Sequence, residues 1–288
     1  MATREGLGKA LPAGLYFIAT PIGTARDITL RALDILRDAD VIAAEDTRTL
    51  RHLMEIHGIP VDHRPMIPYH DHNGETARPR VLRALAEGKT VVYASEAGTP
   101  LVADPGYQLG RAALAEGFAV HAAPGPSAVL AALTVSGLPT DRFMFAGFPP
   151  NTQSARRKWL REFASIPATL VFYESPKRIN AMMSDLVEVF GPEREGALCR
   201  ELTKKFEETR RGPLASILQS LEDSPIKGEI VVLIDRERER KTDPADIEAA
   251  LRAKLTEMRV KDAAKEVAEQ FGLPRRDVYQ LALTLEKE

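Results

Sequence analysis

Two loops rich in glycine and proline are the segments of this chain best suited to holding a ligand. Residues 95–100, SEAGTP, and residues 124–128, PGPSA, each follow a short apolar run that predicts a strand, at 90–94 and 119–122. Glycine lets the backbone approach a ligand, and the N–H groups that open the next helix can bind an anion or a polar group. Open α/β sheets bind ligands at the carboxyl ends of their strands, so we expect a small-molecule site here.

Charged residues crowd the ends of three other apolar runs, at 40–44, 169–173 and 196–200. In chain order they are Glu45, Asp46, Arg48, Glu174, Glu201 and Lys204. Such groups are costly to bury unless they are paired. One interpretation is structural, with salt bridges and with Asp46 or Thr47 capping a helix. The other is a polar wall of a substrate cleft between two domains, and both can hold together.

Other motifs favour no common cofactor chemistry. His70 and His72 could ligate a metal, but no cysteine or second carboxylate cluster accompanies them, so a polar loop facing a substrate is favoured and no metal is expected. The first predicted strand is followed by TPIG at 20–23 rather than by G-x-G-x-x-G. Walker A and G-x-S-x-G motifs are also absent, so NAD, ATP and serine-hydrolase chemistry are not predicted.

Composition is that of a soluble globular protein. The 288 residues are 44% hydrophobic and 28% charged, with no apolar run near the ~20 residues of a membrane span. Cys199 is the sole cysteine, which excludes a disulfide framework, and we expect a cytoplasmic protein. A net charge of −2 does not indicate nucleic-acid binding, and single basic clusters such as 156–158 are best interpreted as solvated faces.

Alternating strand and helix patterns predict two α/β domains. We expect a leader at 1–13, a first α/β domain at 14–145 with a mostly parallel sheet covered on both faces, and a second at 146–242. A helix over 28–36 has Asp27 as its expected N-cap. The tail, 243–288, predicts helices separated by Gly272, with Asp243 as a cap; this is the helix-turn-helix pattern, although a plain three-helix docking module fits equally well.

The ordered motifs together resemble a known family. They are TPIG (20–23), DITLRA (27–32), EDTR (45–48), Tyr69-His70 with Asn73, AGTP (97–100), DPG (104–106), PGPSA (124–128), SGLP (136–139), YESP (173–176) and RELTK (200–204). The set resembles the ribosomal RNA small subunit methyltransferase I family of the tetrapyrrole methylase superfamily. The likeness covers about residues 15–234, and the tail resembles the helix-turn-helix extension of many members.

The resemblance implies an S-adenosylmethionine donor held in the cleft between the domains. It implies 2′-O-methylation of a cytidine in the decoding centre of 16S rRNA, in the assembled small subunit, by a homodimer. The donor-site residues it implies are Pro21, Ser95, Glu96, Ala97, Gly98, Thr99, Val102, Ser127 and Ala128 from the first domain, with Phe172 and Tyr173 from the second. Glu96 stands where members usually have aspartate, which keeps the charge and adds one methylene.

The residues alone leave the base and the substrate open. A ribose 2′-hydroxyl needs a group to take its proton, and Glu45, Asp46, Glu174, Glu201 and Lys204 are candidates, the lysine only with a lowered pKa. Arg48, Arg200 and Lys204 could instead hold phosphates. A tetrapyrrole methyltransferase on the same scaffold and a non-catalytic ribosome-binding or nucleic-acid-binding module are the alternatives.

Overall fold

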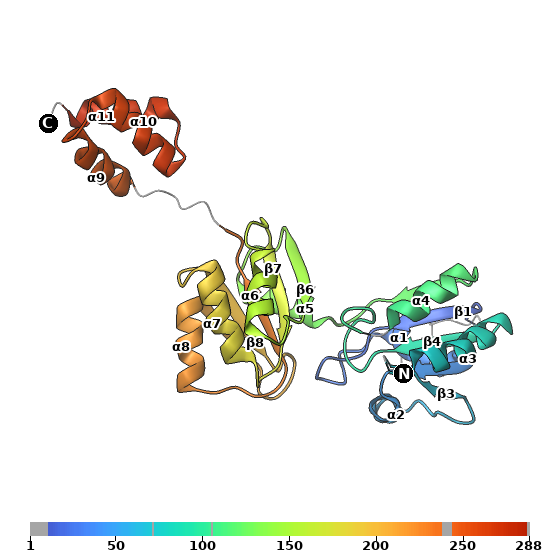
Figure 1. The fold of residues 1–288 in the computed structure, drawn as a ribbon. Helices are drawn as coiled ribbons and strands as arrows, with labels where there is room; N and C mark the ends of the chain where they lie inside the picture. The colour runs from blue at the N-terminus through green and yellow to red at the C-terminus, as the bar shows by residue number, and fades with distance from the viewer. Residues whose placement is uncertain (1–10, 71, 105, 238–243, 287–288) are drawn as a thin grey trace, which may run out of the picture. The chain divides into compact units, whose positions relative to one another are not determined.

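A parallel sheet forms the first half of the protein. The computed structural model describes residues 11–70, 72–104, 106–237 and 244–286, so the predicted leader up to residue 10, Asp71, Pro105 and the predicted cap Asp243 lie outside the described residues. The strands are β1 (Gly14–Ile18), β2 (Val41–Ala44), β3 (Met66–Pro68), β4 (Thr90–Ala94) and β5 (Val120–Ala123). Their order is β3-β2-β4-β1-β5, and every neighbouring pair is parallel. Figure 1 labels β1, β3 and β4 of this sheet.

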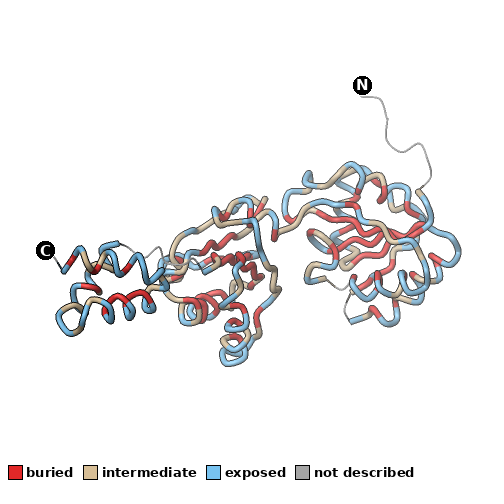
Figure 2. Tube along the Cα trace, turned by 90° about the horizontal axis from the view of Figure 1, so that it is seen from above, coloured by how far each residue is buried: buried red, intermediate tan, exposed pale blue. Residues whose placement is uncertain are grey.

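Helices cover both faces of this sheet, as predicted. Alternate residues of each strand point to opposite faces, so Leu15 and Phe17 belong to one core while Tyr16 and Ile18 belong to the other. The first core is closed by α3 (Gly74–Ala86) and α4 (Gly106–Ala115) and the second by α1 (Leu30–Asp38) and α2 (Thr47–Ile56). Figure 2 shows the buried positions running along the strands.

One predicted cap was wrong. The first helix starts at Leu30, and its N-cap is Thr29, whose side chain accepts a hydrogen bond from the Ala32 N–H. Asp27 instead closes a turn, because its own N–H donates to the Thr24 carbonyl. Thr29 directly precedes the first helical residue, so its hydroxyl, and not the carboxylate of Asp27, caps the helix.

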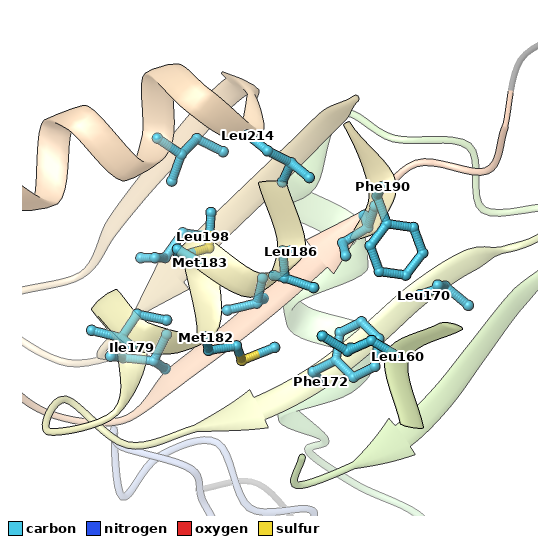
Figure 3. Packing of buried hydrophobic residues seen from close by; sticks show 14 of the residues in the cluster. Leu160, Leu170, Phe172, Ile179, Met182, Met183, Leu186, Phe190, Leu198 and Leu214 are labelled. Carbon is cyan, nitrogen blue, oxygen red and sulfur yellow. The ribbon is translucent and has the colours of Figure 1, made fainter. Parts of the chain in front are cut away.

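The second half holds a mixed sheet. Its strands are β6 (Phe143–Gly147), β7 (Thr169–Glu174), β8 (Glu195–Arg200), β9 (Glu208–Pro213) and β10 (Ile230–Ile234), in the order β6-β7-β10-β8-β9. β6 and β7 are parallel and the other neighbours are antiparallel. The helices α6 (Gln153–Arg161), α7 (Ile179–Phe190) and α8 (Leu214–Asp223) pack on one face, around the core drawn in Figure 3.

Helix α5 (Ala128–Ser136) packs on the other face of the second sheet. It follows β5 of the first sheet, yet Val129, Ala132 and Leu133 share a core with Val171 and Val231. Ile22 and Leu202 join the same core from two loops. The two halves are thus connected by packing as well as by the chain.

A buried ion pair joins α6 to α7. The carboxylate of Asp185 receives hydrogen bonds from Arg156, at 2.7 Å, and from Arg157, at 2.5 Å. Asp185 and Arg156 are both buried, and Arg157 also bonds the exposed Glu188. The hydrogen bonds from two guanidinium groups compensate the free-energy cost of burying the Asp185 carboxylate.

The tail forms a compact unit of its own. Its helices are α9 (Pro244–Leu255), α10 (Val260–Phe271) and α11 (Arg275–Leu285), and α10 ends at Gly272, whose φ of 63° is left-handed. Leu251, Val267, Val278 and Ala282 make a separate core. The predicted fold class, two α/β sheets with a helix-turn-helix-like tail, is confirmed; β3, β9 and α8 were not predicted.

Candidate active site

A pocket of about 430 Å³ opens where loops of the two halves meet. Of the predicted site residues, those in its lining are Glu45, Glu96, Ala97, Gly98, Thr99, Val102, Ser127, Ala128, Tyr173 and Glu174. The lining also contains residues that were not among the predicted site residues. Ile22, Asp104, Ser175, Pro176 and Leu202 belong to the quoted motifs, whereas Ala103, Phe148, Gly228, Glu229, Ile230 and Val231 belong to none. Its volume lies in the range of about 300–1,000 Å³ that small-molecule sites occupy.

Backbone hydrogen bonds fix the first glycine loop in place. Gly98 and Thr20 exchange N–H···O bonds of 2.9 and 3.0 Å, and the Ser95 hydroxyl donates to the Gly98 carbonyl at 2.8 Å. Gly98 has a φ of +82°, which favours glycine. Thr99 ties this loop to the second one by donating to the Pro126 carbonyl at 2.8 Å. Ser95 is therefore buried behind the pocket wall and Gly98 presents its backbone there.

Carboxylates dominate the polar part of the lining. Glu45 accepts a hydrogen bond from the Glu96 N–H at 3.0 Å, and Asp104 accepts from the Tyr93 hydroxyl at 2.8 Å. Burial raises the pKa of the Glu45 carboxyl, and the neighbouring charges of Asp104 and Glu96 raise it further, against the lowering effect of the Glu96 N–H. The pocket consequently suits a cationic ligand and repels a bare phosphate.

The second half contributes an aromatic ring and a buried, ion-paired carboxylate. Tyr173 lines the pocket, whereas the side chain of Phe172 points to the opposite face and packs with Leu160 and Leu170 (Figure 3). Alternation along β7 separates the two rings. Glu174 is buried, but the Ser175 N–H and the Arg178 guanidinium each bond one of its oxygens, at 2.7 Å.

A loop over residues 201–207, here the 201–207 loop, joins the two halves beside the pocket. The Thr24 hydroxyl donates to the Thr203 carbonyl at 2.7 Å, and the Thr24 N–H donates to the Thr203 hydroxyl at 3.2 Å. A Cβ on Gly23 would lie 2.5 Å from the Thr203 hydroxyl, so only glycine permits this approach. Glu201 and Thr203 have φ values of 48° and 64°, a strained conformation for such residues.

The remaining predicted residues lie outside the pocket lining. Asp46 caps α2 by accepting from the N–H groups of Arg48 and Thr49, which lowers the pKa of its carboxyl. Pro21 sits between the Thr20 bridge and Ile22, and the Arg48 side chain is 91% exposed. Hydrogen bonds from the Glu229 N–H and from Lys204 lower the pKa of Glu201.

Lys204 is unsuited to act as a base. Burial alone lowers the pKa of its ammonium group, but the hydrogen bonds to Glu229 and Glu201, at 3.0 and 3.2 Å, outweigh burial and raise it. A lysine that acts as a base needs a lowered pKa, whereas the surroundings of Lys204 raise it.

The histidines of the predicted polar loop do not complete a metal site in the described part of the chain. The rings of His70 and His72 have centroids 6.0 Å apart. Among the described residues, no three histidines, cysteines or acids gather in a group that could hold a metal ion. None of the helices in the described ranges is long and apolar enough to cross a membrane.

Comparison with known proteins decides the family. The family described as Tetrapyrrole (Corrin/Porphyrin) Methylases matches residues 14–218, and an RsmI C-terminal HTH domain matches residues 241–286. A Mesorhizobium japonicum protein named ribosomal RNA small subunit methyltransferase I is 45% identical, over 96% of this chain and 94% of its own length. This chain belongs to the ribosomal RNA small subunit methyltransferase I family of tetrapyrrole methylases. An Escherichia coli O157:H7 protein of the same name is 39% identical, over 93% of this chain and 94% of its own.

Solved tetrapyrrole methylases share the fold of the two α/β halves. Cobalt precorrin-4 methyltransferase gives a TM-score of 0.59 at 17% identity, over 77% of this chain and 94% of that one. Uroporphyrin-III C-methyltransferase from Thermus thermophilus, complexed with S-adenyl homocysteine, gives 0.54 at 20% identity, over 77% of this chain and 97% of that one. These likenesses show that the two α/β halves of this chain have the same fold as those enzymes.

Proposed function

We propose that this protein transfers a methyl group from S-adenosylmethionine to the 2′-oxygen of a cytidine ribose in the decoding centre of 16S rRNA. The observation that carries the proposal is likeness along nearly the whole chain, tail included, to proteins named ribosomal RNA small subunit methyltransferase I. The substrate is the assembled small subunit, because a chain with a net charge of −2 gains little from phosphate neutralisation on naked RNA.

The pocket suits the proposed donor. S-adenosylmethionine supplies a methyl group on a sulfonium centre that is already activated for displacement. The acids Glu45, Glu96 and Asp104 favour its positive charges, and the glycine loop at Gly98 presents backbone groups to its polar tail. Ser95 and Phe172, which the family resemblance also implies, contribute through position: Ser95 holds Gly98, and Phe172 lies in the strand that carries Tyr173. Pro21 directly follows Thr20, which bridges to Gly98.

We assign the proton acceptor to Glu45. Glu174 and Glu201 already bind cations and N–H groups, Asp46 caps a helix, and the pKa of Lys204 is raised. Glu45 lines the pocket, and its raised pKa brings its carboxylate closer to the basicity that general-base catalysis needs at neutral pH. The 2′-oxygen forms its bond to the methyl carbon while the carbon–sulfur bond breaks and the proton passes to Glu45.

Transfer of radiolabelled methyl tests the function directly. Small subunits from cells lacking the activity are expected to accept label in a 16S cytidine, at the ribose. Naked 16S rRNA is expected to accept far less, and equal rates on both would contradict the requirement for the assembled subunit. Label appearing on porphyrinogens but not on subunits would establish the tetrapyrrole alternative, and absence of donor binding would establish the non-catalytic one.

Replacing Arg48 by alanine is expected to lower kcat/KM on small subunits about tenfold while leaving the melting temperature unchanged. The guanidinium is 91% exposed and its single exposed ion pair contributes at most about 1 kcal/mol, whereas a contact to phosphate is a charged hydrogen bond. Lys204→Ala is the contrasting variant. It removes the cation that Glu201 and Glu229 share, and it is expected to lower the melting temperature. Unchanged turnover in Arg48→Ala would remove Arg48 from substrate binding.

Gly23→Ala is expected to weaken donor binding by separating the 201–207 loop from Thr24. The added Cβ would lie 2.5 Å from Lys204 Cγ and from the Thr203 hydroxyl, closer than such contacts allow. Calorimetric titration with S-adenosylmethionine measures the effect, expected at about tenfold or more in Kd from the loss of two hydrogen bonds. Gly74→Ala is the matched control, because its Cβ would meet Tyr69 at an ordinary 3.5 Å.

We further propose a cytoplasmic homodimer, and domain boundaries at 14–145, 146–242 and 243–288. A groove lined by Leu130, Leu133, Leu138 and Phe143 supports self-association, because Leu130 and Phe143 are exposed there and large exposed apolar groups commonly mark interfaces. Light scattering coupled to size-exclusion chromatography gives the mass in solution. A monomer at micromolar concentration would overturn the dimer.

A further inference from the structure

An exposed aromatic residue stands at the mouth of the pocket. Phe148 lines the pocket, and the residue remains 58% exposed. It follows β6 and packs edge-on against Tyr173, with ring centroids 5.5 Å apart; Phe145 packs on Tyr173 at 4.7 Å. The three rings form an aromatic row that begins in the core between the halves and ends in solvent at Phe148. A ring with an open face at a site is available to a ligand.

The backbone around Phe148 is held firmly. Gly147, with a φ of 76°, makes the turn, and the Arg178 guanidinium donates to the Pro149 carbonyl at 2.5 Å. The same guanidinium bonds Asn151 and the buried carboxylate of Glu174. Both sides of the loop are therefore fastened to β7, which also carries Tyr173. A ring fixed in this way loses little conformational freedom when a ligand stacks on it.

The negative charge of the pocket determines which part of an RNA substrate can contact the Phe148 ring. Glu45, Glu96 and Asp104 make the interior unfavourable for a phosphate, so an RNA substrate must enter with its ribose and keep its phosphates outside. Exposed Lys177 follows Pro176 of the rim, where a phosphate could stay. The base attached to that ribose then lies at the mouth. RNA-binding proteins hold unstacked bases on aromatic rings of this kind.

We propose, on the basis of the function proposed above, that Phe148 stacks on the base of the nucleotide whose ribose is methylated. The donor's adenine is the other planar group that could use the ring. Small-molecule ligands bury most of their surface, which favours the enclosed wall near Tyr173 for the adenine and leaves the outer ring to the macromolecule. Phe148 is thus a substrate-binding residue that sets the position of the 2′-hydroxyl.

A series at one position tests this assignment. Phe148→Leu keeps an apolar side chain and removes the ring, and it is expected to lower kcat/KM on small subunits about 5- to 150-fold, the range that loss of one base–aromatic stack gives. Phe148→Tyr and Phe148→Trp retain a ring and are expected to stay within a few-fold of the unaltered protein. Kd for S-adenosylmethionine, by calorimetry, is expected to be unchanged in all three.

Tyr107→Leu is the matched control. Tyr107 lies on α4, is 59% exposed, about as much as Phe148, and lines neither this pocket nor the groove at Phe143. Unchanged kcat/KM in Phe148→Leu, with active unaltered protein, overturns the stacking role alone. A parallel loss of donor affinity places the ring on the adenine, and a change of mass in solution places it in a subunit contact; either overturns it. Failure of the unaltered protein to methylate small subunits overturns the proposed function itself.

Discussion

Glu45→Gln is expected to lower single-turnover methyl transfer about 100-fold or more while raising the melting temperature at neutral pH. A positioned general base typically contributes about 10²–10⁴-fold to a rate, and glutamine keeps the acceptor for the Glu96 N–H but takes no proton. The stability gain follows because burial and the charges of Asp104 and Glu96 oppose ionisation of Glu45. Loss of activity with a gain in stability separates a catalytic role from a structural one.

The pH dependence of this variant has a defined sign. The folded pKa of Glu45 is raised above its unfolded value, so its favourable contribution is present below the unfolded pKa and is lost as pH rises through the folded pKa. The difference in melting temperature between Glu45→Gln and the unaltered protein should therefore shrink as pH falls into the acid range. Methyl transfer by the unaltered protein should fall over the same interval, at a higher pH than an ordinary glutamate would give.

Glu55→Gln is the control for this prediction. Glu55 lies on α2, its side chain is 83% exposed, and the substitution changes net charge equally. It should leave rate and melting temperature unchanged. A lower melting temperature in Glu45→Gln with retained turnover would show that the carboxylate only supports the loop at Glu96.

Asp185→Asn is expected to destabilise the protein by about 3–5 kcal/mol, the cost of breaking a buried ion pair. The change leaves Arg156 buried without its carboxylate and removes one of the two carboxylates that bind Arg157. Denaturant unfolding measures the loss. Methyl transfer per folded molecule should be unchanged, because Asp185 does not line the pocket and belongs to the contact between α6 and α7.

The neighbouring exposed pair supplies the comparison. Glu188→Gln removes only the second partner of Arg157 and should cost at most about 1 kcal/mol, since Glu188 is half exposed. Equal losses in the two variants would contradict the view that burial, rather than pairing, sets the cost.

Most helices and strands could be predicted from local sequence, but only part of the pocket lining could. Apolar runs such as 90–94 and 230–234 predict strands because both faces are buried. β9, ETRRGP, was not predicted because an edge strand needs no apolar face, and β3 is too short and contains Pro68. Glu45 and the glycine loop were predicted because strand ends and glycines are local signals.

The missing parts of the site depend on distant contacts. Thr24 meets Thr203 across 179 positions, and no spacing in either segment signals that hydrogen bond. Gly228 and Glu229 reach the pocket from a turn without a motif, and Phe148 follows a strand like many exposed loop residues. Their roles arise from packing between halves, which periodicity along one segment cannot encode.

The position of α5 has a consequence for synthesis of the protein on the ribosome. Its sheet partners Val171, Cys199 and Val231 all lie far beyond Ser136, the last residue of the helix, so the helix emerges with its apolar face uncovered. A nascent chain stopped at residue 145 would leave Val129, Ala132 and Leu133 without their sheet partners, and exposed apolar surface of this kind makes folding intermediates prone to aggregate. The packing of α5 on the second sheet is therefore completed only after most of the chain has been made, whereas the tail has a core of its own.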